Sequence, residues 1–338
     1  MLFINQTLMS KGNSGVQRYA SNIISNLDSD LEFELMRSNF TGNFGLHFFE
    51  QFVIPAKLSR TDLLWTPTHI APVFHKNSII TVHDLLPIEE PGLFSSSFVL
   101  FYRTVLPILL RNARHVFTVS EFTKERVMRI YNVDYEKITV SRNASKFHID
   151  FSYNRLEFDS LVNKYELGSF FLVVGNIGYH KNSFRILDLW NKYFPSEKLV
   201  FIGKLPNHLY PHFDFHRAGN VNIVHFSDIK DETLANFYKN ARGLIFLSKY
   251  EGFGLPLIEA NSLGCKVIHS DIQVFNEISN DLNSKVSLIS DEDFVNAVTI
   301  LLGSALSEIT RQSLIRASER FNWVSEGEVV SKALKYYI

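Results

Sequence analysis

The sequence lacks several features that would identify its class directly. It contains one cysteine, Cys265, among 338 residues, so an internal disulfide is excluded and a reducing compartment is expected. No apolar run approaches the ~18–20 residues that a membrane-spanning helix needs, and residues 2–8 read as a strand rather than as a secretory signal. We therefore expect a cytoplasmic protein.

The sequence also lacks a strong excess of charge of either sign. Its formal net charge is −1 at pH 7, which argues against binding to nucleic acid. This sum hides one basic stretch, because nine Lys or Arg but only four Asp or Glu lie between residues 103 and 146. Such a stretch is typical either of a solvated face or of a surface that touches anionic lipid.

Clear cofactor patterns are missing as well. The glycine loop at 11–19 lacks the G-x-G-x-x-G spacing of dinucleotide-binding folds, which argues against an NAD site. Three histidines, His208, His212 and His216, have the spacing of metal ligands on one helix face, but prolines in the same stretch interrupt any helix. The acidic clusters at 28–30 and 291–293 do not follow strands. We therefore expect no metal site.

What the sequence does contain is a regular alternation of short β-like runs and helical stretches, which predicts an α/β protein with doubly wound parallel sheets. Strands are predicted near 2–8, 62–66, 79–83, 115–120, 138–141, 170–175, 198–203, 222–226, 244–248 and 266–270. Helices are predicted at 14–27, 94–112, 121–131, 182–193, 231–240, 256–263, 291–302, 308–320 and 322–338.

The chain is predicted to form two domains, because polar residues increase and strand signals lapse between 145 and 169. We expect a first Rossmann-like domain at 1–150 and a second at 151–321, with the last helix packing back on the first domain. Two such domains are expected to face each other across a deep crevice at the carboxyl ends of their strands.

The most informative segment is YEGFGLPLIEA at 250–260, which follows the apolar run at 243–248. Pro256 fits the first turn of a helix, so a strand, a glycine turn and a helix follow one another. The free backbone amides at the start of such a helix are suited to binding an anion. Glu251 and Glu259 lie around this turn, and two carboxylates beside an anion site indicate a ligand with phosphates and hydroxyls, such as a sugar nucleotide. The alternative is a capped helix with two solvated glutamates.

Three other polar segments follow predicted strands. The loop at 11–19 includes Gly15, which permits close approach of a ligand to the backbone. His83 ends a strand and can bind substrate hydroxyls or shuttle a proton, although a structural histidine is the alternative. In VVGNIGYHKN, Lys181 lies near a helix start, where its charge would bind a diphosphate with help from a protonated His180.

Taken together, these segments resemble the retaining glycosyltransferases of family 4, which have the GT-B fold. EGFGLPLIEA is similar to the E-x7-E element of that family, and the stretch at 83–127 resembles the subgroup of O-antigen mannosyltransferases and other enzymes of bacterial surface polysaccharide synthesis. The GVQRY loop, VGNIGYHKN and the closing FNWVSEGEVVSKALKYY also match, so the resemblance covers nearly the whole chain.

The resemblance implies roles for individual residues. Glu251, His83 and Lys181 would be catalytic: Glu251 would face the transferred sugar, His83 would line the reaction centre and Lys181 would neutralise the leaving diphosphate. Glu259 would hold the ribose hydroxyls. The residues implied in donor binding are Glu259, Gly15, Phe253, Gly254, Leu255, Gly175, Asn176, His180, Ser120 and Glu121.

The sequence departs from the family pattern in two respects. Many members have arginine where this chain has His180 or Asn176, so phosphate binding would depend mainly on Lys181 and backbone amides. The usual Gly-Cys-Pro-Val has Lys266 in place of proline, which changes only a loop.

The resemblance implies transfer of a hexose with retention of configuration and without a metal or other cofactor. The leaving phosphate takes the proton of the acceptor, and the protein stabilises the charges of the transition state. GDP-mannose is the first candidate donor, with dTDP- and UDP-sugars also open. A GT-B-type sugar-nucleotide isomerase or phosphorylase, or a non-catalytic sugar-nucleotide-binding assembly protein, are the competing hypotheses.

The predicted helix at 94–112 bears on the acceptor. Phe94, Phe98, Phe101, Tyr102 and Val105 recur at helical spacing, which is typical of core packing. Because basic residues follow directly, the same pattern also fits a membrane interface. We therefore expect the protein to associate loosely with the inner face of the cytoplasmic membrane. We also expect the acceptor to be a glycan that is linked to polyprenyl diphosphate.

Overall fold

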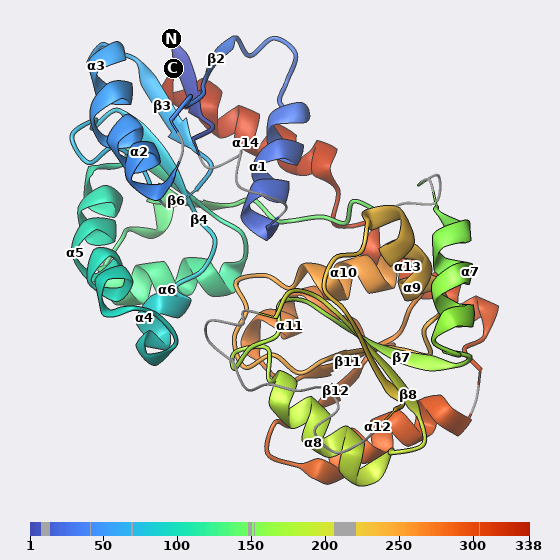
Figure 1. Cartoon of the computed structure of the whole chain (residues 1–338). Coiled ribbons are helices and arrows are strands. Elements are labelled where there is room, and N and C mark those ends of the chain that lie inside the picture. Colours follow the sequence, from blue (N-terminus) through green and yellow to red (C-terminus); the bar gives the residue numbers. More distant parts are fainter. Residues whose placement is uncertain are drawn as a thin grey trace. The chain divides into compact units, whose positions relative to one another are not determined.

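The protein forms two compact units, each built around its own parallel sheet. The computed structural model describes residues 1–7, 14–40, 42–68, 70–147, 151, 153–205, 221–303 and 305–338. Unit 1 consists of Met1–Asn143 and Phe321–Ile338, and unit 2 consists of Ala144–Arg320 (Figure 1). The sequence had placed the boundaries at 150 and 321, so the chain leaves unit 1 slightly earlier than expected.

The sheet of unit 1 has the parallel strand order β2-β1-β3-β4-β5-β6. Its strands are β1 (Leu2–Asn5), β2 (Phe33–Met36), β3 (Leu63–Thr66), β4 (Ser78–Val82), β5 (His115–Thr118) and β6 (Ile138–Val140). Its helices are α1 (Gly15–Ser25), α2 (Gly42–Phe48), the π-helix η2 (Phe49–Val53), α3 (Ile54–Lys57), α4 (Leu86–Glu89), the 3-10 helix η3 (Pro91–Leu93), α5 (Ser96–Asn112), α6 (Glu121–Tyr131), the 3-10 helix η4 (Tyr135–Lys137) and α14 (Trp323–Tyr337).

The sheet of unit 2 has the parallel order β12-β11-β10-β7-β8-β9. Its strands are β7 (Phe170–Val174), β8 (Lys198–Ile202), β9 (Ile223–Phe226), β10 (Leu244–Phe246), β11 (Val267–Ser270) and β12 (Ser284–Val286). Its helices are α7 (Arg155–Lys164), α8 (Ser183–Tyr193), α9 (Asp231–Asn240), α10 (Leu255–Ser262), α11 (Gln273–Ile278), α12 (Asp291–Gly303) and α13 (Glu308–Ser318).

Both sheets are doubly wound, as the sequence predicted, and the order of strands in each reverses at one point. In unit 1 the order reverses between β1 and β3, and in unit 2 it reverses between β7 and β10. At such a switch point the two adjoining loops run to opposite faces of the sheet, which leaves room for a ligand at the carboxyl ends of the strands. The loops after β7 and β10 are those that carry Lys181 and Glu251.

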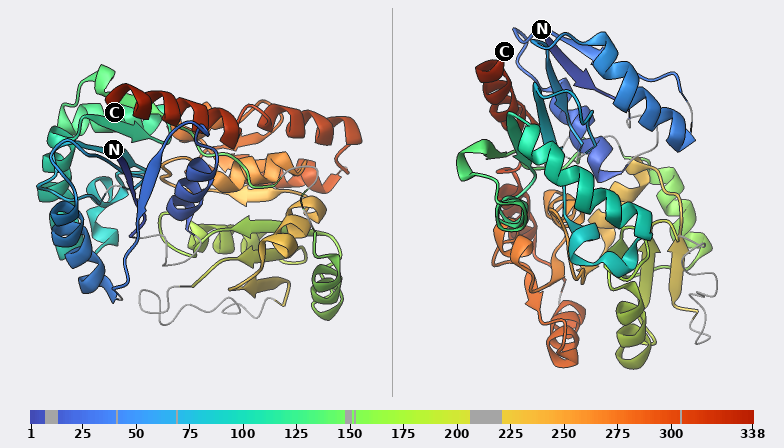
Figure 2. Two further views of the ribbon diagram at one scale, coloured as in Figure 1. Left: turned by 90° about the horizontal axis from the view of Figure 1, so that it is seen from above. Right: turned by 90° about the vertical axis from the view of Figure 1, so that its left-hand side faces the viewer.

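The cores of both units are rich in aromatic side chains. In unit 2, Trp190 packs edge-on against Phe171 of β7, with ring centroids 5.2 Å apart, and Phe194 and Phe294 extend this cluster. In unit 1, α5 and α6 cover strands β4 and β5 through a cluster that includes Tyr102. Helices α1 and α14 cover the opposite side of this sheet (Figure 2).

The aromatic pattern of the helix predicted at 94–112 is largely core packing, although Phe98 is exposed. Helix α5 begins after Ser95, whose side chain caps it by accepting from the N–H of Phe98. Tyr102 is buried, and Phe101 and Val105 pack against the same cluster. Most of the residues that motivated a membrane surface on this helix therefore face the protein interior.

Several strands and helices with weak sequence patterns were not predicted. Strand β2 is an edge strand with alternating exposure, and β12 has only three residues, so neither shows the long apolar run of a central strand. Helix α7 lies in the polar region that had been interpreted as a linker. The short helices α2, α3, α4 and α11 were also not predicted.

Helix α14 returns to unit 1 and packs against α1. Asn322 caps its start, and Lys335 near its end pairs with Asp28 and Asp30, with Nζ 2.7 Å from each carboxylate. The acidic cluster at 28–30 is thus bound to a lysine. At the helix contact, Gly327 lies so close to the backbone of α1 that an added Cβ would be 2.1 Å from the carbonyl oxygen of Asn26.

We expect Gly327→Ala to lower the free energy of unfolding by about 2 kcal/mol or more, because the added methyl forces α14 away from α1. Gly303→Ala is the matched control, because a Cβ there meets no described atom within 4 Å. Scanning calorimetry of both variants and of the parent chain measures the effect. Equal stability of the two variants would contradict this account of how α14 packs.

Candidate functional site

The two loops at the switch point of unit 2 meet through an ion pair. The Nζ of Lys181, at the start of α8, lies 2.5 Å from Oε1 of Glu251, which follows β10. The hydroxyl of Ser248 donates to the same carboxylate oxygen over 2.6 Å. The two side chains of the pair are only 19% and 13% exposed, so this pair is better shielded from solvent than a surface ion pair.

Close backbone packing fixes the Lys181 loop. The N–H of Gly175 donates to the carbonyl of Ile202, and Gly203, with a φ of +155°, lies directly beside Gly175. A Cβ on Gly203 would be 2.0 Å from the Gly175 carbonyl oxygen, so only glycine fits. The aliphatic part of Lys181 passes over Gly175, and its Nζ lies 5.3 Å from the ring centroid of Phe246.

The glutamate turn is fixed in a similar way. Gly254 has a φ of +122°, and a Cβ there would be 2.8 Å from side-chain atoms of both Phe275 and Ile278 in α11. Helix α10 begins directly afterwards at Leu255, with proline in its first turn, and Phe253 is buried. The turn therefore presents the amide end of α10 next to the Lys181–Glu251 pair, which is a suitable arrangement for an anion.

The second glutamate lies deeper than the first. Glu259 is 2% exposed, and the hydroxyl of Tyr238 in α9 donates to its Oε2 over 3.1 Å. A buried carboxylate costs stability unless it is hydrogen-bonded, so this residue is held in place by its surroundings. The alternative interpretation of two solvated glutamates is therefore wrong for both residues.

His180 was expected to help bind a phosphate only if protonated. Burial, reinforced by the neighbouring charge of Lys181, lowers its pKa to about 4, although Glu251 opposes this shift. Its ring is therefore neutral at pH 7 and adds no charge for a phosphate. Its backbone carbonyl accepts from the N–H of Lys249, which ties the two loops together, whereas Asn176 is exposed.

In unit 1, His83 follows β4 and is held by two neighbours. Its Nε2 lies 2.9 Å from the carbonyl oxygen of Pro67, and the ring of Tyr19 packs edge-on at 5.0 Å between centroids. Burial lowers the pKa of His83 to about 4. The ring is thus neutral at pH 7 with its proton on Nε2, and Nδ1 carries the lone pair that can accept a hydrogen bond.

The other residues proposed in unit 1 have structural partners. Ser120 is buried and caps α6, because its Oγ accepts from the N–H of Thr123 over 3.0 Å. Glu121 is half exposed and pairs with Arg142. Gly15 is the first residue of α1, directly after a capping serine, and residues 8–13 before it lie outside the described part of the chain.

Sequence reasoning missed the residues that support the candidate side chains in each unit. Ser248 contacts Glu251, Tyr238 contacts Glu259, and Tyr19 packs on His83. Local signals could not identify Tyr238 or Tyr19, because each lies on a different element from the residue it contacts. Ser248 lies three residues before Glu251 and was the one partner that spacing could have indicated.

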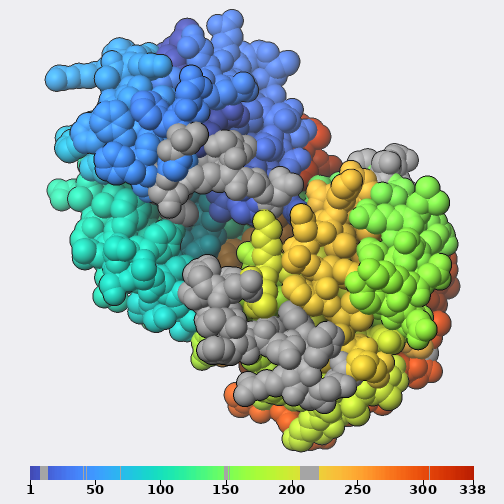
Figure 3. All heavy atoms as spheres, in the orientation of Figure 1, coloured from blue at the N-terminus to red at the C-terminus, as the bar shows by residue number. Residues whose placement is uncertain are grey.

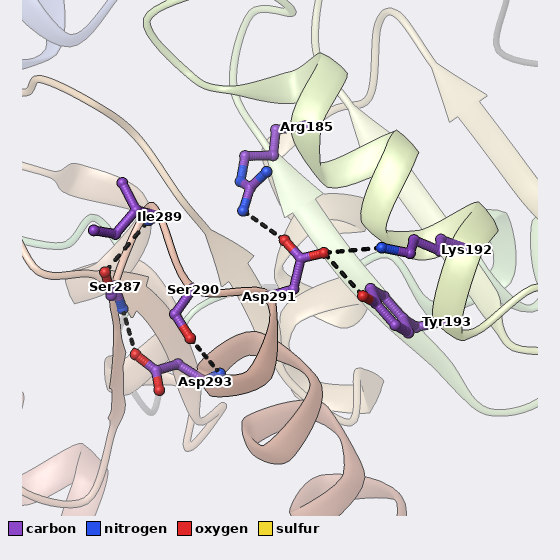
Figure 4. Close-up of polar contacts among 8 residues, drawn as sticks. All are labelled: Arg185, Lys192, Tyr193, Ser287, Ile289, Ser290, Asp291 and Asp293. Carbon is purple, nitrogen blue, oxygen red and sulfur yellow. Dashed lines mark hydrogen bonds and ion pairs between the residues drawn. The ribbon is translucent and has the colours of Figure 1, made fainter.

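The remaining candidates are structural. Asp291 accepts from Arg185, Lys192 and Tyr193 and so joins α12 to α8, while Asp293 accepts from the N–H of Ser287 (Figure 4). Across the described residues, no group of three or more His, Cys, Asp or Glu is arranged to hold a metal. His208, His212 and His216 lie outside those residues.

Two further sequence expectations concern Cys265 and the membrane. Cys265 is buried, and this burial raises its thiol pKa to about 12, as expected of a structural cysteine. Within the described ranges, no helix has the length and apolar character required to span a bilayer.

Comparison with known proteins agrees with this geometry. Residues 156–321 match the model of the family "Glycosyl transferases group 1", so unit 2 carries a domain of that family and the resemblance predicted from the sequence is confirmed. The chain is 30% identical to the O-antigen chain mannosyltransferase RfbU of Salmonella typhimurium over 66% of its own length, and spans 60% of that relative. It is 24% identical to the O-antigen chain mannosyltransferase B of Escherichia coli over 76% of its own length and 70% of the relative.

Solved structures confirm the predicted GT-B fold class. Anabaena HepE in complex with UDP-glucose superposes with a TM-score of 0.74 at 16% identity, covering 99% of both chains. WaaG, a glycosyltransferase involved in lipopolysaccharide biosynthesis, has a TM-score of 0.70 at 13% identity and covers 98% of this chain and 99% of its own. The fold is therefore that of glycosyltransferases with two Rossmann-like domains.

We expect His83 to make stability depend on pH. Because its folded pKa, about 4, lies below the unfolded value of 6.5, the unfolded chain binds more protons between these values, and stability falls as pH drops from 6.5 to 4. The contribution is roughly 2–3 kcal/mol between pH 7 and pH 4.5.

The variant His83→Gln can still donate to the Pro67 carbonyl but does not titrate. Urea unfolding of both proteins at pH 7 and pH 4.5 separates the effect of His83 from that of the carboxylates. The parent chain should lose more stability than the variant on acidification. An equal loss in both would show that His83 is not held neutral.

Proposed function

We propose that this protein is a retaining glycosyltransferase that moves a hexose from a nucleotide-diphosphate sugar to a lipid-linked or oligosaccharide acceptor in surface polysaccharide synthesis. The observation that carries this proposal is the shielded Lys181–Glu251 pair beside the amide end of α10. It lies at the switch point of a sheet within a glycosyl transferases group 1 domain. Mannose is the first candidate sugar, because relatives from two organisms are named mannosyltransferases.

The donor would bind with its diphosphate on Lys181 and on the amides at the start of α10. A cation and a helix N-terminus that lie together provide charge and directed N–H donors for phosphate oxygens. Glu259, one turn into α10, would accept from the ribose hydroxyls, and Glu251 would accept from hydroxyls of the transferred sugar. The name of the neighbour HepE, in complex with UDP-glucose, supports a nucleotide sugar as the ligand class.

The reaction would depend on electrostatic stabilisation rather than on a strong protein base. His83 and His180 both have pKa values of about 4, and a group with so low a pKa is a poor general base at pH 7. A mechanism in which the leaving phosphate takes the acceptor proton fits this chemistry. Lys181 would stabilise the charge that develops on that phosphate, and Nδ1 of His83 would accept a hydrogen bond from a sugar hydroxyl. We propose that no metal is needed for this role.

Transfer should therefore depend on both members of the ion pair. We expect Lys181→Ala and Glu251→Ala each to lower kcat by at least ~100-fold, the usual cost of removing a group that stabilises the transition state. Lys192→Ala, a lysine at the other end of α8 that is 63% exposed, is the matched control and should retain full activity.

The assay measures release of nucleoside diphosphate from GDP-, UDP- and dTDP-sugars with and without a polyprenyl-diphosphate-linked glycan, in EDTA and in Mn²⁺. Release that requires the acceptor supports transfer, and the anomeric coupling constant of the product reports retention. Unchanged transfer by both alanine variants would refute the site. Complete loss in EDTA with recovery in Mn²⁺ would refute the metal-free mechanism.

Lys181 and Glu251 would also exchange partners when the donor binds. A diphosphate on Lys181 competes with Glu251 for the ammonium group, and the released carboxylate becomes available to the sugar. Binding of the diphosphate and recognition of the sugar are then coupled through one ion pair. A free nucleoside diphosphate has to break the pair without gaining the sugar contact.

Glu251→Gln should consequently have opposite effects on two ligands. We expect it to tighten binding of the free nucleoside diphosphate by roughly 3–10-fold, since a partly shielded ion pair contributes about 1 kcal/mol. The sugar nucleotide should lose its advantage over the free diphosphate, because the sugar contact is weakened. Isothermal titration calorimetry with both ligands measures this, and equal weakening of both would contradict the exchange.

A further inference from the structure

We propose that unit 1 binds the surface of an anionic lipid membrane through an exposed aromatic face on α2 and η2. This aromatic face consists of Phe44, Phe48 and Phe52 on these helices, together with Phe40 before α2 and Phe74 between β3 and β4. It differs from the surface predicted from the helix at 94–112, where Phe101 and Tyr102 pack in the core. The inference rests on the proposed function only in that a lipid-linked acceptor is found at such a surface.

Three rings of the aromatic face, those of Phe40, Phe48 and Phe52, lie side by side. Phe44, Phe48 and Phe52 follow one another at intervals of four residues, and the rings of Phe48 and Phe52 lie 5.3 Å apart between centroids. Phe40 lies 6.0 Å from Phe48. The exposed fractions are large, reaching 86% for Phe44. The light-blue segment that contains these helices lies at the surface in Figure 3.

The side chain of Gln51 holds the segment that carries Phe74 beside this face. Gln51, next to Phe52 in η2, donates to the carbonyl of Ala71 over 2.9 Å and accepts from the N–H of Val73 over 3.0 Å. The segment that carries Phe74 is therefore fixed beside η2. Phe74 itself is 80% exposed, so the stripe widens into a patch.

The same helices already bury a second apolar side. Phe49 and Ile54 pack with Met36 and Leu64 in the core of unit 1, and Leu46 is buried. The exposed phenylalanines are thus additional to what the fold requires. Burial of one such side chain contributes about 1.5–3 kcal/mol, and exposed apolar patches of this kind mark sites of interaction.

The charged residues around the aromatic face favour an anionic lipid surface as its partner. On the described residues of α2, η2, α3 and α5, every exposed titratable side chain is basic or histidine: His47, Lys57, Arg103 and Arg111. The one carboxylate, Glu50, is 1% exposed and accepts from the amide of Asn5 over 2.7 Å.

Helix α5 continues the same face. Asn112, at its end, donates to the carbonyl of Val73 and so joins α5 to the segment that carries Phe74, and α5 lies on the same side of unit 1 as α2 and α3 (Figures 1 and 2). Leu100 and Ile108 of α5 are also exposed. Exposed carboxylates lie nearby as well, Glu34 beside Lys57 and Glu90 ahead of α5. The exposed titratable side chains on the helices themselves are nevertheless basic or histidine, and aromatic and aliphatic groups with such neighbours match the acyl boundary and the anionic headgroups of a membrane surface.

The test uses flotation of the full chain with vesicles of phosphatidylcholine alone or mixed with phosphatidylglycerol. The parent chain should float with the anionic vesicles at low salt, and less at high salt because the cations are screened. The triple variant Phe44→Ser, Phe48→Ser and Phe52→Ser should lose at least ~10-fold in affinity, since three apolar side chains no longer insert. The triple variant Lys57→Ser, Arg103→Ser and Arg111→Ser should lose the preference for anionic vesicles.

The control replaces by serine three apolar residues of unit 2 that are at least as exposed on average, Leu156, Ile289 and Ile309, which are 86%, 93% and 81% exposed. This control should float like the parent chain. The melting temperature of each variant is measured alongside, so that a loss of flotation is counted only for a folded protein.

Three results would overturn the proposal: no flotation of the parent chain at low salt, normal flotation of the phenylalanine variant, or an equal loss in the control. If the parent chain instead forms a dimer that the phenylalanine variant dissolves, and does not float, the occupant is a second copy and the proposal is also wrong. Flotation without any transfer activity would refute the proposed function and leave this inference standing, whereas transfer to a soluble acceptor without flotation would do the reverse.

Discussion

The arrangement of unit 2 depends on the reversal of strand order between β7 and β10. A parallel sheet needs a crossover helix after each strand, and where the winding direction changes, the two neighbouring loops leave the sheet toward opposite faces. Here those loops carry Lys181 and Glu251, and the space between them is closed by an ion pair 2.5 Å long. The glycines at 203 and 254 are required because each lets one chain segment approach another without a side chain between them.

Burial sets the protonation state of two candidate histidines, one in each unit. His83 and His180 are held neutral by desolvation, which a nearby cation reinforces at His180. Lysine 181 then supplies positive charge next to Glu251, and the amide end of α10 adds a directed partial charge. A site of this kind is suited to holding an anion and to stabilising a leaving anion. It is less suited to moving protons through a protein side chain at neutral pH.

The 30 phenylalanines of the chain serve two different purposes. Those such as Phe171, Phe201 and Phe294 fill the space between sheet and helices in unit 2. Phe44, Phe48 and Phe52 on α2 and η2 are exposed, whereas Phe49 of η2 is buried in the core. Composition does not separate the two groups, since both occur in segments with many aromatic residues. The separation depends on which side of each helix meets the sheet.

The sequence by itself determined the alternating α/β architecture, most of the strands of both sheets and the loops in which the polar residues lie. These features follow from local periodicity and from glycine and proline positions, which act over a few residues. The roles that the family resemblance assigns to Glu251, Glu259 and His83 stay predictions. Only the tertiary structure decided that Lys181 pairs with Glu251, 70 residues away, that Tyr238 supports Glu259, that His180 is neutral, and which phenylalanines are exposed. Each of these properties depends on atoms brought together from distant parts of the chain, and no local pattern records them.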